Sequence, residues 1–551
     1  MNHISRKPGY PKGRQVDLSA LARVRDLLGD RPRSRDLLIE HLHLIQDRHG
    51  SLSAAHLAAL AAEMGLALTE VYEVATFYAH FHVLEEGAEH TVTVRVCDGL
   101  PCEMMGAGAL LEDLKGRFGA GVRVVRAPCM GRCDRAPVVE AGHRHVTGAD
   151  APAVAAALES GDLEPEIPPY TGLEAYRASG GYAILGDCLD GTRSSDDVIQ
   201  TVEESGLRGM GGAGFPTGRK WRIVSGYPGP RLMALNADEG EPGTFKDRML
   251  METDPHRVLE GMLIAAWVVE AEDVYVYLRD EYPGLRRMFT AEIERLAGAG
   301  LASATRIHLR RGAGAYICGE ESAMVESIEG KRGLPRNRPP YLAEKGLFGR
   351  PTLINNPETV FYVRDILQKG PAWYSGEGRR GCRGSRYFSV SGRVKEPGVK
   401  LAPAGVTANE LIEEFSGGMA DGHTFKGYAP GGASGGILPA SKADIPLDFG
   451  SLDELDCFIG SAAVIVFSDQ DNMAAAALNL MRFFADESCG QCTPCRVGCE
   501  KAVKLMEDGP WDEALLTELS TAMVDASICG LGQAAPNPLL SALKYFPEAL
   551  P

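Results

Sequence analysis

A run of three cysteines carries the clearest chemical signal in this 551-residue sequence. Cys489, Cys492 and Cys495 follow the spacing C-x2-C-x2-C. Three thiolates at this spacing can bind one face of a [4Fe–4S] cluster from a single loop, and a remote fourth cysteine completes the site. Zinc sites more often use separated C-x2-C pairs, and free thiols are the remaining interpretation. The spacing therefore predicts a [4Fe–4S] site.

Two cysteines are candidates for the fourth ligand. Cys499 completes a C-x3-C spacing, but Glu500 replaces the proline expected in bacterial ferredoxins, and the segment VGCEKAVKLM is helical in pattern. Cys529 lies in SICGLGQAAPNP, where glycine and proline interrupt the helical pattern and let the backbone approach a cluster closely. We therefore expect Cys529 to be the ligand and Cys499 to belong to the core.

A second group of cysteines lies nearer the N-terminus. Cys97 and Cys102 form C-x4-C at the end of one predicted strand, and Cys129 and Cys133 form C-x3-C at the end of another. Adjacent strands would bring the four thiolates together. The wide loops favour a [2Fe–2S] centre over zinc, and the absence of C-x2-C disfavours a redox-active dithiol.

Glycine-rich segments provide a different kind of candidate site. The segment GMGGAG satisfies G-x-G-x-x-G, but the preceding DDVIQTVEESG is helical in pattern, so the usual Rossmann fingerprint is rejected. Glycines still let backbone N–H groups and a flat ring approach one another. Phe215 could stack on such a ring and Lys220 could face a phosphate. A flexible surface loop is the alternative. The glycines concerned are Gly209, Gly211, Gly212 and Gly214.

Two further loops combine glycine with polar side chains. One follows the apolar run LMAL, at a strand end where α/β proteins bind ligands. The other precedes a predicted helix. Isolated carboxylates usually belong to a solvated surface, but three such loops together favour a nucleotide site. The polar positions are Asn236, Asp238, Glu239 and Glu241 in the first loop, and Tyr316, Gly319, Glu320 and Glu321 in the second.

Composition limits the protein class. Hydrophobic residues (44%) and charged residues (24%) have the proportions of a folded protein. The net charge of −17 argues against nucleic-acid binding. The longest apolar runs, such as Met262–Val269 and Ala462–Phe467, are too short for a membrane span. No apolar core follows the basic first residues, so we expect no secretory signal and a cytoplasmic location. In a reducing compartment, clustered cysteines more often bind metal than form disulfides.

Hydrophobic periodicity divides the chain into five parts. Residues 1–85 are predicted to be a helical bundle with a basic tail over residues 1–16, and 86–160 a β–α–β–β thioredoxin-like unit. A proline-containing linker begins an α/β region over 161–385. Residues 386–455 show a β–turn–β–α, β-grasp-like pattern, and 456–551 are mainly helical with cysteines between the helices.

Several long motifs resemble a known family. The segments SGLRGMGGAGFPTGRKW, NADEGEPGTFKDR, RRGAGAYICGEESAMVESIEGKRG, INNPETV and ESCGQCTPC…ICGLGQAAPNP resemble the NADH-binding flavoprotein subunit of respiratory complex I. This module also occurs in NAD-reducing hydrogenases and NAD-dependent formate dehydrogenases. EVYEVATFYAHFHV, with the first four cysteines, resembles the smaller [2Fe–2S] subunit of complex I, fused in front. RNRPPYLAEKGLFGRPTL, FSVSGRVKEPGVKLAPAG and CFIGSAAV look most like the beta subunit of molybdenum- or tungsten-dependent formate dehydrogenase.

The resemblance implies a multidomain fold of α+β and α/β units. These are a helical bundle with a thioredoxin-like ferredoxin domain, a Rossmann-like FMN/NADH domain, a β-grasp domain and a C-terminal helical bundle carrying an iron–sulfur cluster. FMN would be held by Gly209–Gly214, Lys220, Asn236, Asp238, Glu239, Tyr316, Gly319, Glu320, Asn355 and Asn356. NADH would stack on the flavin with its adenine near Phe215 and Tyr341, and Glu241 and Glu321 would meet its polar groups.

Three positions depart from the complex I pattern. Arg338 replaces a lysine and Tyr341 a phenylalanine, and both substitutions keep the charge or the ring. We therefore expect altered affinity and retained binding. Pro357 interrupts the usual N-N-V-E-T motif and puts the geometry of Asn356 in question.

The implied function is electron transfer between a partner enzyme and NAD⁺. A flavin exchanges hydride with NAD and single electrons with clusters, so no side-chain acid or base is expected at hydride transfer. The expected partner is a catalytic alpha subunit that carries a molybdenum or tungsten pterin and further iron–sulfur clusters and oxidises formate to CO2. Alternatives are the diaphorase subunit of an NAD-reducing hydrogenase, a fused complex I subunit, and a non-catalytic iron–sulfur scaffold.

Overall fold

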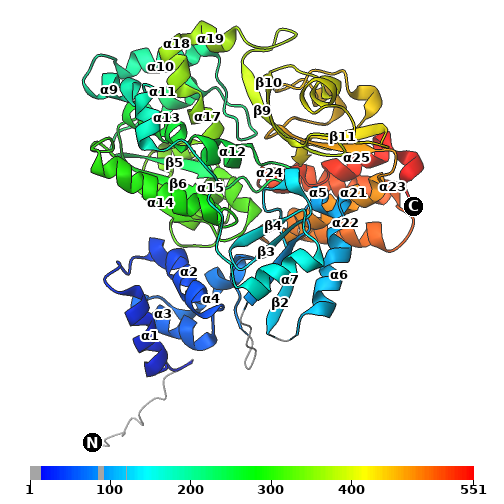
Figure 1. Cartoon of the computed structure of the whole chain (residues 1–551), viewed down its shortest axis with the longest axis horizontal. Helices are drawn as coiled ribbons and strands as arrows, with labels where there is room; N and C mark the ends of the chain where they lie inside the picture. Colours follow the sequence, from blue (N-terminus) through cyan, green and yellow to red (C-terminus); the bar gives the residue numbers. More distant parts are fainter. Residues whose placement is uncertain (1–13, 85–91, 120) are drawn as a thin grey trace, which may run out of the picture.

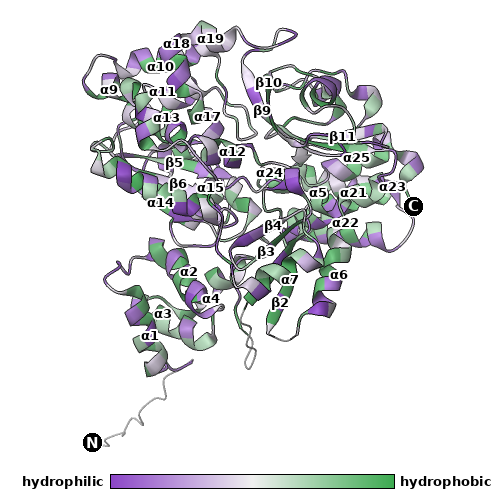
Figure 2. Cartoon of the chain, viewed as in Figure 1, coloured by the Kyte–Doolittle hydropathy of each residue, from purple (hydrophilic) through white to green (hydrophobic). Residues whose placement is uncertain are grey.

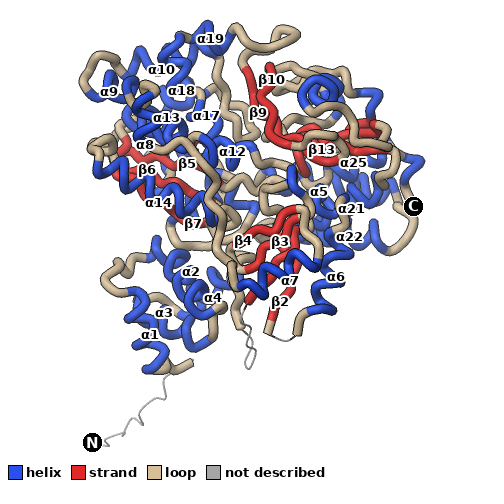
Figure 3. Tube along the Cα trace, in the orientation of Figure 1, coloured by secondary structure: helices blue, strands red, loops and turns tan. Residues whose placement is uncertain are grey.

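The computed structural model describes residues 14–84, 92–119 and 121–551. Most of the predicted basic tail, and the predicted boundary between residues 85 and 86, lie outside these ranges. In the described part, three sheets lie apart from one another, with helices around and between them (Figure 1, Figure 3). None of its helices combines the length and the apolarity that a membrane crossing requires.

The N-terminal part is a bundle of amphipathic helices, whose ribbons carry both hydrophobic and hydrophilic residues (Figure 2). Asp17 and Ser53 cap two of these helices by accepting hydrogen bonds from the backbone N–H groups of Ala20 and His56. Gly50 and Gly65 end two helices in the left-handed conformation. The helices are α1 (Leu18–Leu28), α2 (Leu38–His49), α3 (Ala54–Met64) and α4 (Leu68–Phe77).

The next unit is built on a sheet with the strand order β2-β1-β3-β4. β1 (Val92–Cys97) and β2 (Val122–Ala127) are parallel, whereas β3 (Val138–Ala141) and β4 (Arg144–Thr147) form an antiparallel hairpin. The helices are α5 (Leu100–Met104), α6 (Ala107–Arg117) and α7 (Ala151–Ser160). The parallel pairing of β1 and β2 places the loops that follow both strands at the same edge of the sheet.

The central unit has a fully parallel sheet in the order β7-β6-β5-β8. Helices cover it, so its middle strands are almost continuously apolar and buried. The strands are β5 (Arg231–Ala237), β6 (Ala271–Leu278), β7 (Arg306–Arg311) and β8 (Thr352–Asn355). The helices are α8 (Leu173–Ala178), α9 (Ala183–Leu189), α10 (Ser195–Ser205), α11 (Thr217–Ser225), α12 (Lys246–Thr253), α13 (Pro255–Val268), α14 (Pro283–Gly298), α15 (Glu321–Ile328), α16 (Leu342–Lys345), α17 (Pro357–Phe361), α18 (Val363–Lys369) and α19 (Pro371–Ser375).

The third sheet has the order β10-β9-β13-β11-β12. Its strands are β9 (Ser385–Gly392), β10 (Gly398–Pro403), β11 (Phe425–Ala433), β12 (Leu438–Pro439) and β13 (Ala463–Ser468), and the short α20 (Ala408–Glu410) continues into a π-helical turn. The boundary predicted after residue 455 divides this sheet, because β13 pairs with β9 and β11 across that boundary. The apolar run AVIVF is therefore a buried central strand of this unit, which extends to Ser468.

The last part is helical, and its core is continuous with that of the other units. Val74, Ile317 and Phe484, from three separate parts of the chain, belong to one hydrophobic core. The helices are α21 (Met473–Asp486), α22 (Thr493–Glu507), α23 (Glu513–Ala526), α24 (Gly530–Ala534) and α25 (Asn537–Tyr545). This shared core fixes the positions of the cysteine loops relative to the central sheet.

Candidate functional site

A cavity of about 510 Å³ opens where the glycine-rich loops, the ends of β5 and β8, and α24 meet. Its wall combines segments that are remote in sequence. Most of the polar and glycine positions predicted to bind ligand line it. They are Gly209, Gly211, Gly212, Gly214, Phe215, Lys220, Asn236, Glu239, Glu241, Tyr316, Gly319, Glu320, Glu321, Asn355 and Asn356, and Arg338 joins them.

The first glycine loop connects two helices, α10 and α11, as the helical pattern before it predicts. The backbone N–H of Gly209 donates to the carbonyl of Phe215 at 2.8 Å and closes the loop. Gly212 has φ +122°, and a Cβ there would find only Gly460 nearby, at 3.8 Å. Gly211 lies so close to Asn356 that its Cβ would be 3.3 Å from that side chain. The loop therefore presents bare backbone to the cavity.

Three asparagines are fixed by hydrogen bonds. Asn236 Nδ2 donates to the carbonyl of Gly319 at 2.9 Å, and Asn355 Oδ1 accepts from Trp221 Nε1 at 2.9 Å. Asn356 caps α17, with Oδ1 accepting from the backbone N–H of Thr359 at 3.3 Å. The three amides therefore form a rigid part of the wall.

Pro357, which put the geometry of Asn356 in question, occupies the first position of α17. Proline favours this position, because its fixed φ suits a helix start and its missing N–H would have no partner there. The proline is therefore compatible with the Asn356 cap.

Two of the predicted carboxylates are already bound by protein groups. Glu239 accepts from the backbone N–H groups of Asp247 and Arg248 at 2.6 and 2.9 Å, which caps α12. Burial raises the pKa of Glu239 to about 7. Glu241 accepts from the N–H and hydroxyl of Ser434 at 2.7 and 2.8 Å and from the hydroxyl of Tyr316. Both carboxylates thus hold the wall together.

The charged rim contains two ion pairs. Lys220 Nζ lies 3.1 and 3.2 Å from the two carboxylate oxygens of Glu321. Arg338 pairs with Glu320, whose carboxylate also caps α15. Both lysine and arginine can exchange a carboxylate for a phosphate. The rim is therefore suited to an anionic ligand.

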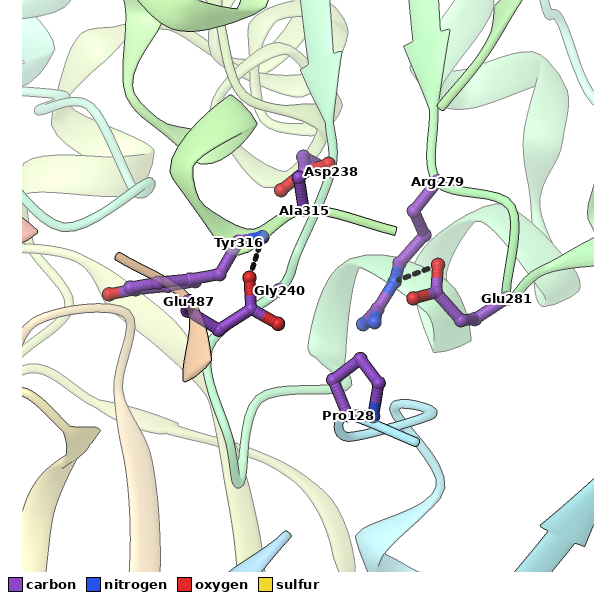
Figure 4. Close-up of a pocket in the computed structure, with 8 residues that line it drawn as sticks. All are labelled: Pro128, Asp238, Gly240, Arg279, Glu281, Ala315, Tyr316 and Glu487. Atoms are coloured by element: carbon purple, nitrogen blue, oxygen red, sulfur yellow. Dashed lines mark hydrogen bonds and ion pairs between the residues drawn. The ribbon is translucent and has the colours of Figure 1, made fainter. Parts of the chain in front are cut away.

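Asp238 and Tyr341 do not line this cavity. Backbone φ at Glu239 is +39°, and the turn after β5 directs Asp238 into a small neighbouring cavity with Arg279, Glu281 and Glu487 (Figure 4). Burial raises the pKa of Asp238 well above its usual range. Tyr341 begins α16 with 62% of its side chain exposed. Neither residue therefore lines the main cavity, although the small cavity shares Gly240 and Tyr316 with it.

The cavity also has wall residues that the sequence motifs did not identify. They come from the third sheet and the C-terminal helices: Ser434, Phe458, Gly460, Ser461, Gly530, Leu531 and Ala534. The glycine-rich segments PGGASGG and CFIGS were the sequence signals that could have pointed to these wall residues. The sequence did not indicate which part of the fold these segments would pack against. Leu531 lies two residues after Cys529, so the cavity adjoins the C-terminal cysteine site.

The four N-terminal cysteines are buried together where β1 and β2 end. Each is at most 4% exposed, and the sulfurs of Cys129 and Cys133 are 3.4 Å apart. The backbone N–H of Gly131 donates to Cys129 Sγ at 3.4 Å. Phe245 from the central unit packs on this loop. The group, completed by Cys97 and Cys102, is therefore enclosed between two units.

The C-terminal cysteines lie at helix starts. Cys492 caps α22, Cys495 lies in its first turn, and Cys529 caps α24. Burial raises the pKa of Cys529 to about 11, although backbone N–H groups of α24 oppose the shift. Cys499 lies one turn after Cys495 in α22, is fully buried, and lowers the pKa of Cys495 to about 7 through a hydrogen bond. Cys489 completes the half-exposed loop before α22.

These arrangements fit a flavin nucleotide and two iron–sulfur clusters. The hydroxyl of Thr217 is buried in the cavity wall and has no hydrogen-bond partner among the residues that the structure describes. The glycine backbone leaves room for a flat ring. Sulfur donors gathered at two loops are the ligands that iron–sulfur clusters require.

Three family models match consecutive parts of the chain. Residues 24–161 match "Thioredoxin-like [2Fe-2S] ferredoxin", and residues 202–365 match "Nuo51 FMN-binding domain". Residues 475–550 match "NADH-ubiquinone oxidoreductase-F iron-sulfur binding region". The first of these spans the helical bundle together with the thioredoxin-like unit.

Complete proteins match as well. The second F-type subunit of the NADH-quinone oxidoreductase of Rhizobium meliloti is 42% identical over 396 residues, which cover 69% of this chain and 94% of the relative. The F-type subunit of the Escherichia coli NADH-quinone oxidoreductase is 40% identical, and the match covers 68% of this chain and 88% of the relative. A chain of the NAD⁺-reducing [NiFe]-hydrogenase, solved in the H2-reduced state, superposes with a TM-score of 0.83 at 32% identity. That match covers 94% of this chain and 93% of the hydrogenase chain, so it includes the N-terminal units.

Proposed function

We propose that this chain transfers electrons from a partner enzyme to NAD⁺. It belongs to the family of NADH-binding flavoprotein subunits that includes the F-type subunit of NADH-quinone oxidoreductase, and the proposal starts from this membership. The chain is an NAD-dependent oxidoreductase module that uses FMN, a [2Fe–2S] cluster and a [4Fe–4S] cluster. The observation that carries the proposal is the cavity wall that adjoins Cys529 through Gly530 and Leu531.

We assign the FMN to the glycine loop and the fixed amides of this cavity. Gly211, Gly212 and Asn356 would lie against the ring, and Lys220 would exchange Glu321 for a phosphate. The dinucleotide would occupy the outer part, against Phe215. Asp238 and Tyr341 are left out of this assignment because they do not line the cavity.

We assign the clusters to the two cysteine groups. Cys97, Cys102, Cys129 and Cys133 would hold the [2Fe–2S] cluster, which their common burial supports. Cys489, Cys492, Cys495 and Cys529 would hold the [4Fe–4S] cluster, since three of these lie in or before the first turn of α22 and the fourth caps α24.

When bound, the flavin supplies hydride exchange with the dinucleotide and one-electron exchange with the clusters. The protein groups hold and orient these cofactors. The glycine loop would hold the flavin, and the outer part of the cavity would take the nicotinamide. Glu239 and Glu241 accept hydrogen bonds from protein groups and keep the loops fixed. Because these carboxylates are engaged, we assign them no proton transfer. Leu531, an apolar residue of the cavity wall two positions after Cys529, would keep water out of this part of the site.

We further propose that the partner is a molybdenum- or tungsten-dependent formate dehydrogenase subunit, based on the segments RNRPPYLAEKGLFGRPTL and FSVSGRVKEPGVKLAPAG. The test is purification of the native complex, followed by metal analysis and measurement of NAD⁺ reduction with formate. We expect molybdenum or tungsten and formate-dependent NADH formation.

An NAD-reducing hydrogenase is the second candidate, because the hydrogenase chain matches the N-terminal units as well as the rest. In that case nickel would co-purify and H2 would support NAD⁺ reduction. If neither formate nor H2 supports the reaction, a partner of the quinone-reductase type is indicated. Absence of flavin from the native protein would leave only the scaffold interpretation and refute the proposal.

A further inference from the structure

Two buried arginines lie between the loop of the N-terminal cysteines and the loop of the flavin cavity. Arg248 Nε donates to the carbonyl of Gly131 at 2.7 Å, and the side chain of Arg279 joins the two loops directly. Arg279 follows β6 directly and is 4% exposed. Its Nη2 donates to the carbonyl of Cys129 at 2.5 Å, and its Nη1 donates to the carbonyl of Glu239 at 2.6 Å. A planar guanidinium presents several donors in fixed directions, so one side chain can hold two backbone carbonyls in a set relation.

Arg279 lies between carboxylates on one side and the cysteine loop on the other, and Asp238 and Glu487 line the same small cavity. The ion-pair partner of Arg279 is the carboxylate of Glu281, 3.2 Å from Nε (Figure 4). Figure 4 shows the guanidinium between this carboxylate and Pro128, which directly precedes Cys129. The two remaining nitrogens, Nη1 and Nη2, donate to uncharged carbonyls, so positive charge faces the cysteine loop.

Tyr282 reinforces the same connection. Its hydroxyl donates to Glu239 Oε2 at 2.8 Å, and its ring centre lies 5.1 Å from the Arg279 guanidinium. A Cβ on Gly131, between Cys129 and Cys133, would lie 2.1 Å from the same hydroxyl. The cysteine loop therefore packs directly on the residues that position Glu239, with no room for a larger side chain.

The geometry points to Arg279 as a positioning residue that fixes the [2Fe–2S] loop against the flavin loop and raises the reduction potential of that cluster. This inference rests on the proposed assignment of Cys129 as a cluster ligand. Reduction of a [2Fe–2S] cluster adds one electron and hence one negative charge. A buried positive charge beside the ligand stabilises that reduced form, and charge and hydrogen bonding near the sulfurs are established controls of potential.

The test is an EPR-monitored redox titration of the full chain, comparing the parent with four variants. Arg279→Gln should reduce the equilibrium constant for reduction of the [2Fe–2S] cluster at least tenfold, which is about 59 mV for one electron. Glu281→Gln removes the opposing negative charge. It should raise the equilibrium constant for reduction of the cluster at least threefold, which is a shift of the potential in the other direction. Arg287→Gln is the matched control, because Arg287 is half-exposed and pairs with Glu164, and it should stay within twofold of the parent.

The fourth variant, Arg279→Lys, keeps the positive charge but lacks the planar guanidinium with its donors in fixed directions. It should shift the potential less than Arg279→Gln does. An Arg279→Gln protein that retains the cluster at the parent's potential, with or without lower stability, overturns the inference. If that variant does not fold, Glu281→Gln decides, and an unchanged or lower potential overturns the inference. A parent protein without a reducible [2Fe–2S] signal would instead refute the proposed function, before any variant is compared.

Discussion

Replacing Gly212 with valine separates flavin binding from folding. The φ of +122° at Gly212 is accessible almost only to glycine, so any side chain there costs on the order of 1–3 kcal/mol of backbone strain. An added Cβ would lie 3.8 Å from its nearest neighbour, the backbone of Gly460. The valine methyl groups would therefore extend into the cavity, where we place the flavin.

The strain is present with and without ligand, so it lowers stability more than affinity. Occupation of the ligand's space resembles overpacking of a core, which costs about 1–3 kcal/mol. At 1.4 kcal/mol per tenfold change, the Kd for FMN should rise roughly 5- to 140-fold. The measurement is flavin per chain after purification, with iron per chain measured on the same sample. We expect little flavin and nearly the parent's iron content.

Gly509→Val is the matched control, because Gly509 has φ +151° and, in the described part of the chain, nothing within 4 Å of its Cβ position. It lies between α22 and α23, away from the cavity. This variant should suffer similar strain and keep its flavin. Full flavin occupancy in Gly212→Val, or equal loss in both variants, would show that the loop does not form the flavin site.

Three further predictions follow from the site. Cys499→Ser should leave the iron of the C-terminal cluster in place while Cys529→Ser removes it; the reverse result would exchange the two assignments. Glu321→Gln should raise kcat/KM for NADPH relative to NADH about tenfold with an artificial acceptor, because a carboxylate repels a 2′-phosphate; a ratio within twofold of the parent would point to another discriminator. Lys246→Met should cost about 3–5 kcal/mol and lower Tm, because it leaves the buried carboxylate of Glu358, 2.7 Å from the lysine, without its partner. Adding Glu358→Gln should recover part of the loss, and an unchanged Tm in Lys246→Met would contradict the ion-pair argument.

Local patterns were sufficient for much of the fold. The spacing of apolar residues predicted the helices of the N-terminal bundle and the helix before the glycine loop. Both depend on short-range periodicity and on caps within a few residues, which the sequence contains directly. The glycine positions likewise reflect backbone geometry at single residues, as the φ of Gly212 illustrates.

Cysteine spacing predicted two cluster-type sites, because two or three of the ligands to one cluster commonly come from the same short loop. The tertiary structure decided which segments surround them. β13 joins β9 across a predicted boundary, Asp238 turns into a separate cavity, and Ser434 and Leu531 close the main one. These relations depend on which buried faces pack together over hundreds of residues, and a local pattern contains no information about its distant partner. The junction at Arg279 is of the same kind, since an arginine after a strand acquires its role only when two remote carbonyls, those of Cys129 and Glu239, are folded against it.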